Sequence, residues 1–307
     1  MSSQFSLLVA FLSLISFVVI LGFWMTYIRP ALKPTTLVSA GIWFVLGLSA
    51  WILVTSAQLM GQFERFSIPV SFTSRGHYVS TILLLTPLVS VLGAKRPGIR
   101  FWNFFVVIPM LLMLNWPLIA EAFGTVPNRT LNLEPPALMG AFVVLMMVLG
   151  NYFGTLFTLP AVLYCLGIAF ALTTTSESMP HLLESSLAVR GISGLLVTVS
   201  FVISARRMKA AAAQRAGFEG LWLDFRDWFG ILWTRRVMDR LNQTAEQEGW
   251  VCRLTLEGLE WDADVAESAR RETRLKMDHA FRWMFRRFVD EEWIDQRLEH
   301  SAKKLDS

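Results

Sequence analysis

Residues 135–176 read PPALMGAFVVLMMVLGNYFGTLFTLPAVLYCLGIAFALTTTS, a run of 42 residues without a charged side chain. A single helix of that length would extend about 63 Å, which is twice the roughly 30 Å hydrocarbon core of a bilayer. The stretch GNYFGT at residues 150–155 is typical of a turn. The run therefore predicts two membrane-spanning helices joined by a tight turn, and a re-entrant segment is the alternative interpretation.

Charge is distributed unevenly along the chain. Only 17% of all residues are charged, against about 25% in soluble domains. Residues 1–205 hold nine basic and five acidic side chains, whereas residues 206–307 hold nineteen of each. The first two thirds are expected to lie in lipid and the last third in water. The basic pI of about 9.3 comes from the loops, so we expect no nucleic-acid partner.

Hydropathy predicts seven membrane spans, each close to the 20 apolar residues that a bilayer requires. The predicted spans are 5–27, 37–59, 78–94, 101–120, 136–152, 156–174 and 187–205. The third and fifth are short. The expected fold is an all-α integral membrane protein, namely a seven-helix transmembrane bundle at 1–205 followed by a mainly helical cytoplasmic domain at 206–307.

Basic residues near the spans set the predicted orientation. Cytoplasmic loops are enriched in Lys and Arg. With the N-terminus outside and the C-terminus in the cytoplasm, the cytoplasmic segments receive a basic group at three places: Arg29 and Lys33; Lys95, Arg96 and Arg100; Arg206, Arg207 and Lys209. No charge precedes the first apolar run, which argues against a cleaved signal. We therefore expect a bacterial cytoplasmic membrane as the location.

The C-terminal third contains three predicted elements. An amphipathic aromatic helix is expected at 219–247, with Asp224 and Asp227 on its polar, solvent-facing side. Alternation of apolar and polar residues predicts a short strand pair, a candidate β-hairpin, at 251–261. A long helix is expected at 263–299.

Polar residues inside the spans are the candidates for a substrate cavity. Asn103, Asn115, Asn151 and Tyr152 lie within predicted spans four and five. Amides in hydrocarbon need hydrogen-bonding partners, so the alternative is that they link helices. Ionisable residues are expected only outside the central parts of the spans, which lowers the expectation of a pump or an ion-coupled transporter.

Two histidines are candidates for a metal or haem site on the outer face. His77 and His181 are expected in the second and sixth loops, and imidazole is a common metal ligand. Their spacing matches no motif, so the alternative is that both are solvated. The sequence contains no phosphate-binding glycine loop, nucleophile elbow or metalloprotease motif. It therefore offers no catalytic residue and indicates no cofactor, and it leaves the question of enzymatic activity open while favouring a non-catalytic role.

The aromatic helix of the tail has three interpretations. Its large side chains could lie at the membrane interface, dock on the long C-terminal helix, or bind a partner protein. The candidate interface residues are Trp222, Phe225, Trp228, Phe229 and Trp233. Together with the lipid bilayer as surroundings, these features favour a non-catalytic scaffold or membrane subunit of a larger assembly. The alternatives are a permease subunit for a neutral or apolar substrate, paired with a separate ATPase, and an outer-face metal or haem site.

Overall fold

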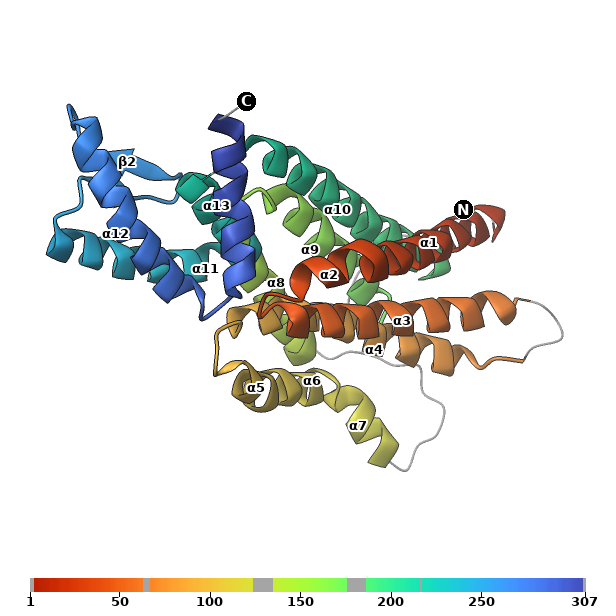
Figure 1. Cartoon of the computed structure of the whole chain (residues 1–307). Helices are drawn as coiled ribbons and strands as arrows, with labels where there is room; N and C mark the ends of the chain where they lie inside the picture. The colour runs from red at the N-terminus through yellow and green to blue at the C-terminus, as the bar shows by residue number, and fades with distance from the viewer. Residues whose placement is uncertain (1–2, 63–66, 124–134, 176–185, 216, 306–307) are drawn as a thin grey trace.

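The computed structural model describes residues 3–62, 67–123, 135–175, 186–215 and 217–305. This part of the chain is mostly helical and includes one small antiparallel sheet of two strands. Long apolar helices form an elongated bundle, and a separate group of elements built from the last third of the chain lies at one end of it (Figure 1).

The elements follow one another along the chain with short connections. The first half consists of α1 (Ser3–Phe23), η1 (Trp24–Ile28), α2 (Arg29–Leu32), α3 (Val38–Met60), α4 (Val70–Leu92), α5 (Ile99–Trp102), η2 (Asn103–Val107), α6 (Ile108–Leu114) and α7 (Trp116–Phe123). The second half consists of α8 (Pro135–Tyr152), α9 (Thr158–Thr173), α10 (Ser186–Gln214), α11 (Gly217–Glu248), β1 (Cys252–Leu254), β2 (Leu259–Trp261), α12 (Glu267–Phe285) and α13 (Glu291–Leu305).

Length and composition indicate a membrane location for the apolar helices. Within the described residues, four helical stretches are long and apolar enough to cross a membrane: Gln4–Leu32, Val38–Met60, Val70–Leu92 and Ser186–Gln214. A fifth candidate is the pair Ile99–Leu114 and Trp116–Phe123, which is bent by 59°. The helices α8 and α9 are also apolar but shorter; with 18 and 16 residues, they extend about 27 and 24 Å.

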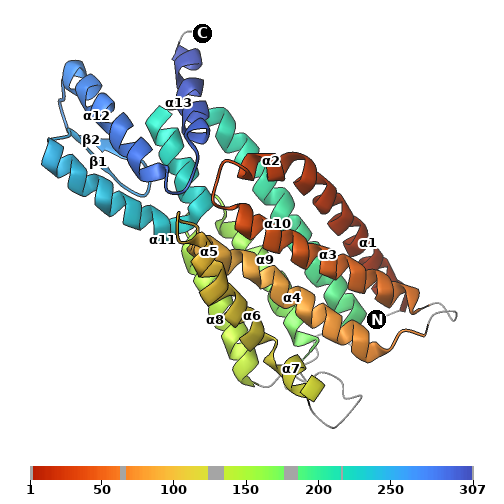
Figure 2. The ribbon, with the colours of Figure 1, turned by 60° about the horizontal axis from the view of Figure 1, so that its bottom comes forward.

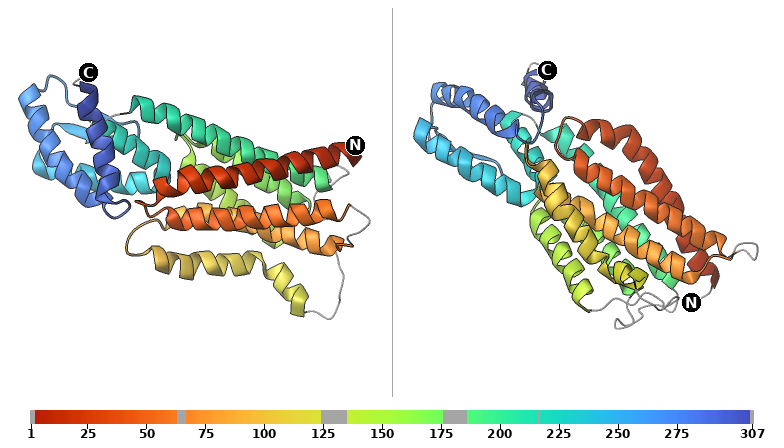
Figure 3. Two further views of the ribbon diagram at one scale, coloured as in Figure 1. Left: turned by 45° about the vertical axis from the view of Figure 1, so that its right-hand side comes forward. Right: turned by 90° about the horizontal axis from the view of Figure 1, so that it is seen from below.

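The apolar helices pack side by side along a common direction (Figures 2 and 3). Helix α3 packs against α4, α9 against α10, and α1 against both α3 and α10. Helix α8 contacts α4 and α9, while α6 contacts α4 and α8. The uncharged run at 135–176 thus contains two helices with a turn at Gly154, whose φ is +77°, as the sequence predicted.

Helix α4 begins earlier than its sequence predicted. It starts at Val70 instead of residue 78, so Arg75 and His77 lie in the helix. Hydropathy missed this first turn because its polar side chains have partners on other helices. Arg75 forms an ion pair with Glu121 of α7 (2.6 Å), and His77 shares a hydrogen bond with Gln58 of α3 (2.8 Å).

The C-terminal unit, residues 217–305, has a core of its own that extends into the bundle. Aromatic side chains of α11 and α12 stack at its centre, including Phe225 and Phe285, whose rings lie 4.5 Å apart. The same cluster of buried residues includes Leu37, Val91 and Ala94 from the ends of the apolar helices. Burial of aromatic surface is the largest stabilising contribution here, and it holds the unit against the bundle.

Two predictions for the tail differ in outcome. The strand pair is confirmed, with Cys252 opposite Trp261 and Leu254 opposite Leu259. The single long helix at 263–299 is wrong, because the chain leaves helical conformation between α12 and α13. The backbone there pairs with a distant loop instead: the amide of Asp290 donates to the carbonyl of Pro34 (2.7 Å).

Candidate functional site

Main-chain hydrogen bonds join the C-terminal unit to the ends of the apolar helices. The amide of Thr36, before α3, donates to the carbonyl of Phe288 (2.8 Å). The amide of Arg96, after α4, donates to the carbonyl of Arg287 (2.8 Å), and its guanidinium pairs with Asp290 (2.6 Å). Two loops far apart in sequence therefore bind the same segment between α12 and α13.

A buried carboxylate fastens a third loop to the unit. Asp227 of α11 is 1% exposed and accepts a hydrogen bond from the amide of Leu156, in the turn between α8 and α9 (3.1 Å). Its charge is balanced by Arg215 (2.7 Å) and Arg226 (3.1 Å). Arg207 of α10 donates to the carbonyl of Leu156 from the other side (2.9 Å). A buried charge needs such partners, because desolvation of an unpaired carboxylate is costly.

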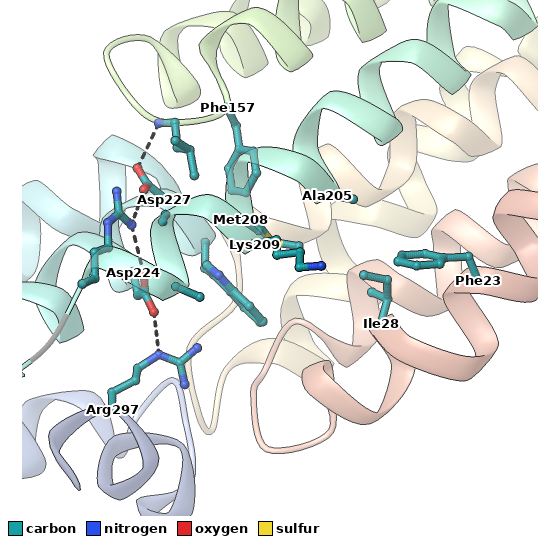
Figure 4. Close-up of a pocket in the computed structure, with 14 residues that line it drawn as sticks. Phe23, Ile28, Phe157, Ala205, Met208, Lys209, Asp224, Asp227 and Arg297 are labelled. Carbon is teal, nitrogen blue, oxygen red and sulfur yellow. Dashed lines mark hydrogen bonds and ion pairs between the residues drawn. The ribbon is translucent and has the colours of Figure 1, made fainter. Parts of the chain in front are cut away.

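A second carboxylate extends this charged cluster toward the C-terminal helix (Figure 4). Asp224 binds Arg215 (3.0 Å) and Arg297 of α13 (2.8 Å). Burial acts to lower the pKa of Arg215, but its hydrogen bonds and the charges of Asp227 and Asp224 outweigh burial, so its pKa lies above the ordinary value. Burial lowers the pKa of Arg297, and the charge of Asp224 opposes that effect.

The cluster lies beside a crevice of about 280 Å³ between the apolar helices and the C-terminal unit. Its apolar wall includes Phe23, Ile28, Phe157, Ala205 and Met208 (Figure 4). Both aspartates are engaged by guanidinium groups, an arrangement that suits a clamp between two parts of the chain better than proton transfer. In the described part of the chain, no three His, Cys, Asp or Glu side chains gather closely enough to hold a metal ion.

Two of the predicted cavity residues form separate local hydrogen bonds. Asn103 accepts from the indole of Trp43 (3.0 Å) and donates to the carbonyl of Ile99 (2.8 Å). Asn115 lies at the bend between α6 and α7 and donates to the carbonyl of Leu111 (2.8 Å). These bonds match the alternative of the sequence analysis, in which the amides hold helices in place.

The other two lie where α8 meets the C-terminal unit. Asn151 is 6% exposed and accepts a hydrogen bond from the amide of Leu232 in α11 (3.1 Å). That amide is free to donate because α11 is interrupted at Gly230, whose φ is +79°. Tyr152 packs its ring edge-to-face with Phe157, with the ring centroids 6.2 Å apart. The four predicted residues thus bind different partners instead of lining one cavity.

The histidine pair is only half described. His77 does not lie in a loop, as the sequence predicted, but in α4, where it is 2% exposed. Its ring packs edge-on against Trp51, with the centroids 5.3 Å apart. His181 lies outside the described residues. The metal or haem site therefore stays a prediction, and His77 already has a structural role.

The aromatic residues proposed as a partner surface are turned inward. Trp222, Phe225 and Phe229 are fully buried, and Trp233 is 8% exposed. Trp228 is partly buried and contacts Trp293 of α13 edge-on. Intramolecular docking, one of the three interpretations, accounts for all of them, so a partner would have to bind a different surface.

Sequence reasoning missed the charged cluster at the junction. It placed Asp224 and Asp227 on a solvent-facing side, but both pack against other elements of the chain. One signal was available: these aspartates sit on a helix among arginines at 215 and 226, and acids and bases in such proximity often pair. The partners Leu156 and Arg297 lie 71 and 73 residues away, and no local pattern indicates them.

Comparisons with protein-family models, curated proteins and solved structures found no match to this chain.

Proposed function

We propose that the chain is a seven-pass membrane protein that acts as a non-catalytic membrane subunit, with its C-terminal unit held as a fixed platform in the cytoplasm. The loops after α2, α4 and α8 all bind this unit. An alternating path of seven spans accounts for that arrangement, because it returns the chain to the same side after spans one, three, five and seven. Helices α8 and α9 would then be the two shortest spans.

The distribution of charge supports the proposed orientation. The end that carries the unit has basic residues at each of its charged connections, listed from the N-terminus as Arg29, Lys33, Lys95, Arg96, Arg100, Arg206 and Arg207. The positive-inside tendency places such an end in the cytoplasm. The N-terminus of α1 lies at the opposite end (Figure 3), which corresponds to the outside of a bacterial cytoplasmic membrane.

One observation carries the proposal of a fixed platform. The segment 287–290 is hydrogen-bonded through its backbone to loops at both ends of the α3–α4 pair, and Asp227 binds the α8–α9 turn from within. Every such link would have to break for the unit to swing away from the bundle. A rigid attachment of this kind suits a subunit that presents a surface at a constant distance from the membrane.

The outward face of α12 is the surface that the platform offers. Leu275 is 71% exposed and Trp283 is 42% exposed, and Arg271 and His279 are exposed between them at helical spacing. The guanidinium of Arg287 lies 4.5 Å from the centre of the Trp283 ring. Exposed Trp and Arg side chains are common at the centres of protein interfaces.

Co-purification tests the proposal. The full chain is extracted in mild detergent from its native membrane, and the mass of its protein component is measured by light scattering and native mass spectrometry. We expect a mass above 34.8 kDa through a stoichiometric second polypeptide, which is lost in the Leu275→Asp, Trp283→Ala variant and retained in an Arg253→Ala control. A solitary 34.8 kDa chain, or equal retention in both variants, would contradict the proposed role.

A second candidate, a permease subunit for an apolar substrate, rests on a different feature. Beside the bend at Asn115, a groove of about 510 Å³ lies between α6–α7 and α8. Its lining is largely apolar and includes Met113, Trp116 and Pro117. If the co-purified polypeptide hydrolyses ATP and its activity responds to apolar compounds, this candidate replaces the scaffold. A partner without ATPase activity excludes the ATPase-driven version.

A further inference from the structure

We infer that the groove between the end of α8 and the second half of α11 is a binding site for one anionic phospholipid of the cytoplasmic leaflet. The groove measures about 540 Å³. One side is apolar and is formed by Leu92, Met147 and Ile231, and the other carries Arg235 and Arg236. A lipid has the same division, with acyl chains on one side of its glycerol and a phosphate on the other.

The apolar side opens toward the lipid-facing surface of the bundle. Met147 of α8 is 49% exposed and Leu232 of α11 is 41% exposed. Both are large apolar side chains at the end of the apolar helices, where a soluble ligand would gain little from them. Acyl chains that lie along α8 would cover this surface.

The polar side has positive charge available for a phosphate. Among the described residues, neither Arg235 nor Arg236 forms an ion pair with a carboxylate, although Asp239 also lines the groove. Arg236 and Asp239 are shared with an adjoining pocket that is lined by Lys95, Arg240 and Arg287. The two pockets together have five basic groups for one acid. Basic pockets next to membrane helices on the cytoplasmic side are the sites where anionic headgroups bind.

A buried donor without a partner marks the bottom of the groove. Asn151 lines the groove and uses its Oδ1 to accept from the amide of Leu232. Its Nδ2 is buried and has no hydrogen-bond partner among the described residues. Buried amide donors are nearly always satisfied, and a phosphate or glycerol-ester oxygen would supply the missing acceptor.

Gly230 leaves the space that this arrangement requires. A Cβ at Gly230 would overlap the amide group of Asn151. The positive φ at Gly230 also interrupts α11, which begins a second helical segment beside the groove. Amides at a helix start favour anions, and the two arginines lie within its first turns.

Native mass spectrometry of the full-length protein in detergent tests the inference. The protein is titrated with phosphatidylglycerol and, separately, with phosphatidylcholine of the same acyl chains. We expect one phosphatidylglycerol to bind at least roughly tenfold more tightly than phosphatidylcholine, and the Arg235→Gln, Arg236→Gln variant to lose that preference, at roughly one decade of affinity for the two charges. The Arg271→Gln variant, on the exposed face of α12, should retain it.

Two further arms make the result decisive. Asp239→Asn removes the acidic group and should tighten phosphatidylglycerol binding, and unchanged or weaker binding would contradict an anionic headgroup at this site. Glycerol 3-phosphate in excess should not displace the lipid; displacement would replace the lipid by a soluble phosphate ligand. Equal binding of both lipids, or an unchanged preference in the double variant, overturns the inference. The inference rests on the proposed membrane orientation, but the titration does not depend on a protein partner, so the two proposals can fail separately.

Discussion

The strongest single test of the junction is the substitution Asp227→Asn. The variant keeps the shape of the side chain and removes its charge. Arg215 and Arg226, whose side chains are 16% and 13% exposed, would then keep their positive charges without the carboxylate that lies between them. The amide could still accept the hydrogen bond from Leu156.

The expected loss follows from these contacts. Removal of one partner of a buried ion pair costs about 3–5 kcal/mol. Because Arg215 keeps its contact with Asp224 (3.0 Å) and Leu156 keeps an acceptor, we expect the lower end, about 3 kcal/mol. For a cooperative unit of this size, that loss corresponds to a fall in melting temperature of about 12–24 °C.

The chain contains natural reporters for the measurement. Both cysteines are free and buried, Cys165 in α9 and Cys252 in the C-terminal unit. A maleimide dye that fluoresces after reaction follows unfolding of the detergent-solubilised protein, and mass spectrometry of the labelled peptides separates the two sites. We expect Cys252 to become reactive at a lower temperature in the variant, with a smaller change at Cys165.

A matched control is Asp278→Asn, which removes a partly exposed carboxylate from an ion pair with Arg282 within α12. Exposed pairs of this kind contribute about 1 kcal/mol or less, so its melting temperature should change little. If Asp227→Asn changes the stability no more than the control does, the reasoning that Asp227 is a buried clamp is refuted.

Three other predictions use the same assay. Gly230→Ala should cost at least about 2 kcal/mol through backbone strain and the clash with Asn151, whereas Gly249→Ala, also at positive φ but with open space around it, should cost about 1 kcal/mol; equal losses would contradict the close approach. Phe225→Ala should lower stability by about 3–5 kcal/mol because its ring is fully buried, and a loss below about 1 kcal/mol would refute its place in the core. Burial raises the pKa of Cys252 from 9.0 to about 11; the folded state therefore favours the neutral thiol, and its stabilising effect should be complete below pH 9 and lost as the pH rises toward 11, a change that Cys252→Ser should abolish.

The elements that sequence predicted correctly are those fixed by local patterns. The alternation around Cys252 and Leu254 specified a strand because one face is buried and the other exposed. The uncharged run specified two helices because its length exceeds what one span can use. The aromatic stripe around Phe225 specified a buried helix face, although it did not say what covers that face.

The elements that sequence missed depend on contacts across the chain. The stop between α12 and α13 exists because residue 290 bonds to residue 34, and neither segment shows this alone. The early start of α4 depends on Gln58 and Glu121, which satisfy its polar first turns. The clamp at Asp227 likewise has its partner in a turn 71 residues away. A pattern of hydropathy records solvent preference, not pairing.

The central claim is that the basic loops and the C-terminal unit lie on one side of a membrane. Single cysteines at Gln62, Arg100 and Arg206, all exposed in the structure, can be labelled with an impermeant maleimide on intact spheroplasts, because the natural cysteines are buried. The account predicts that Gln62→Cys reacts from outside and that Arg100→Cys and Arg206→Cys react only after the membrane is opened. Labelling of Arg100→Cys and Arg206→Cys from opposite sides, or of Gln62→Cys together with Arg206→Cys, would contradict it.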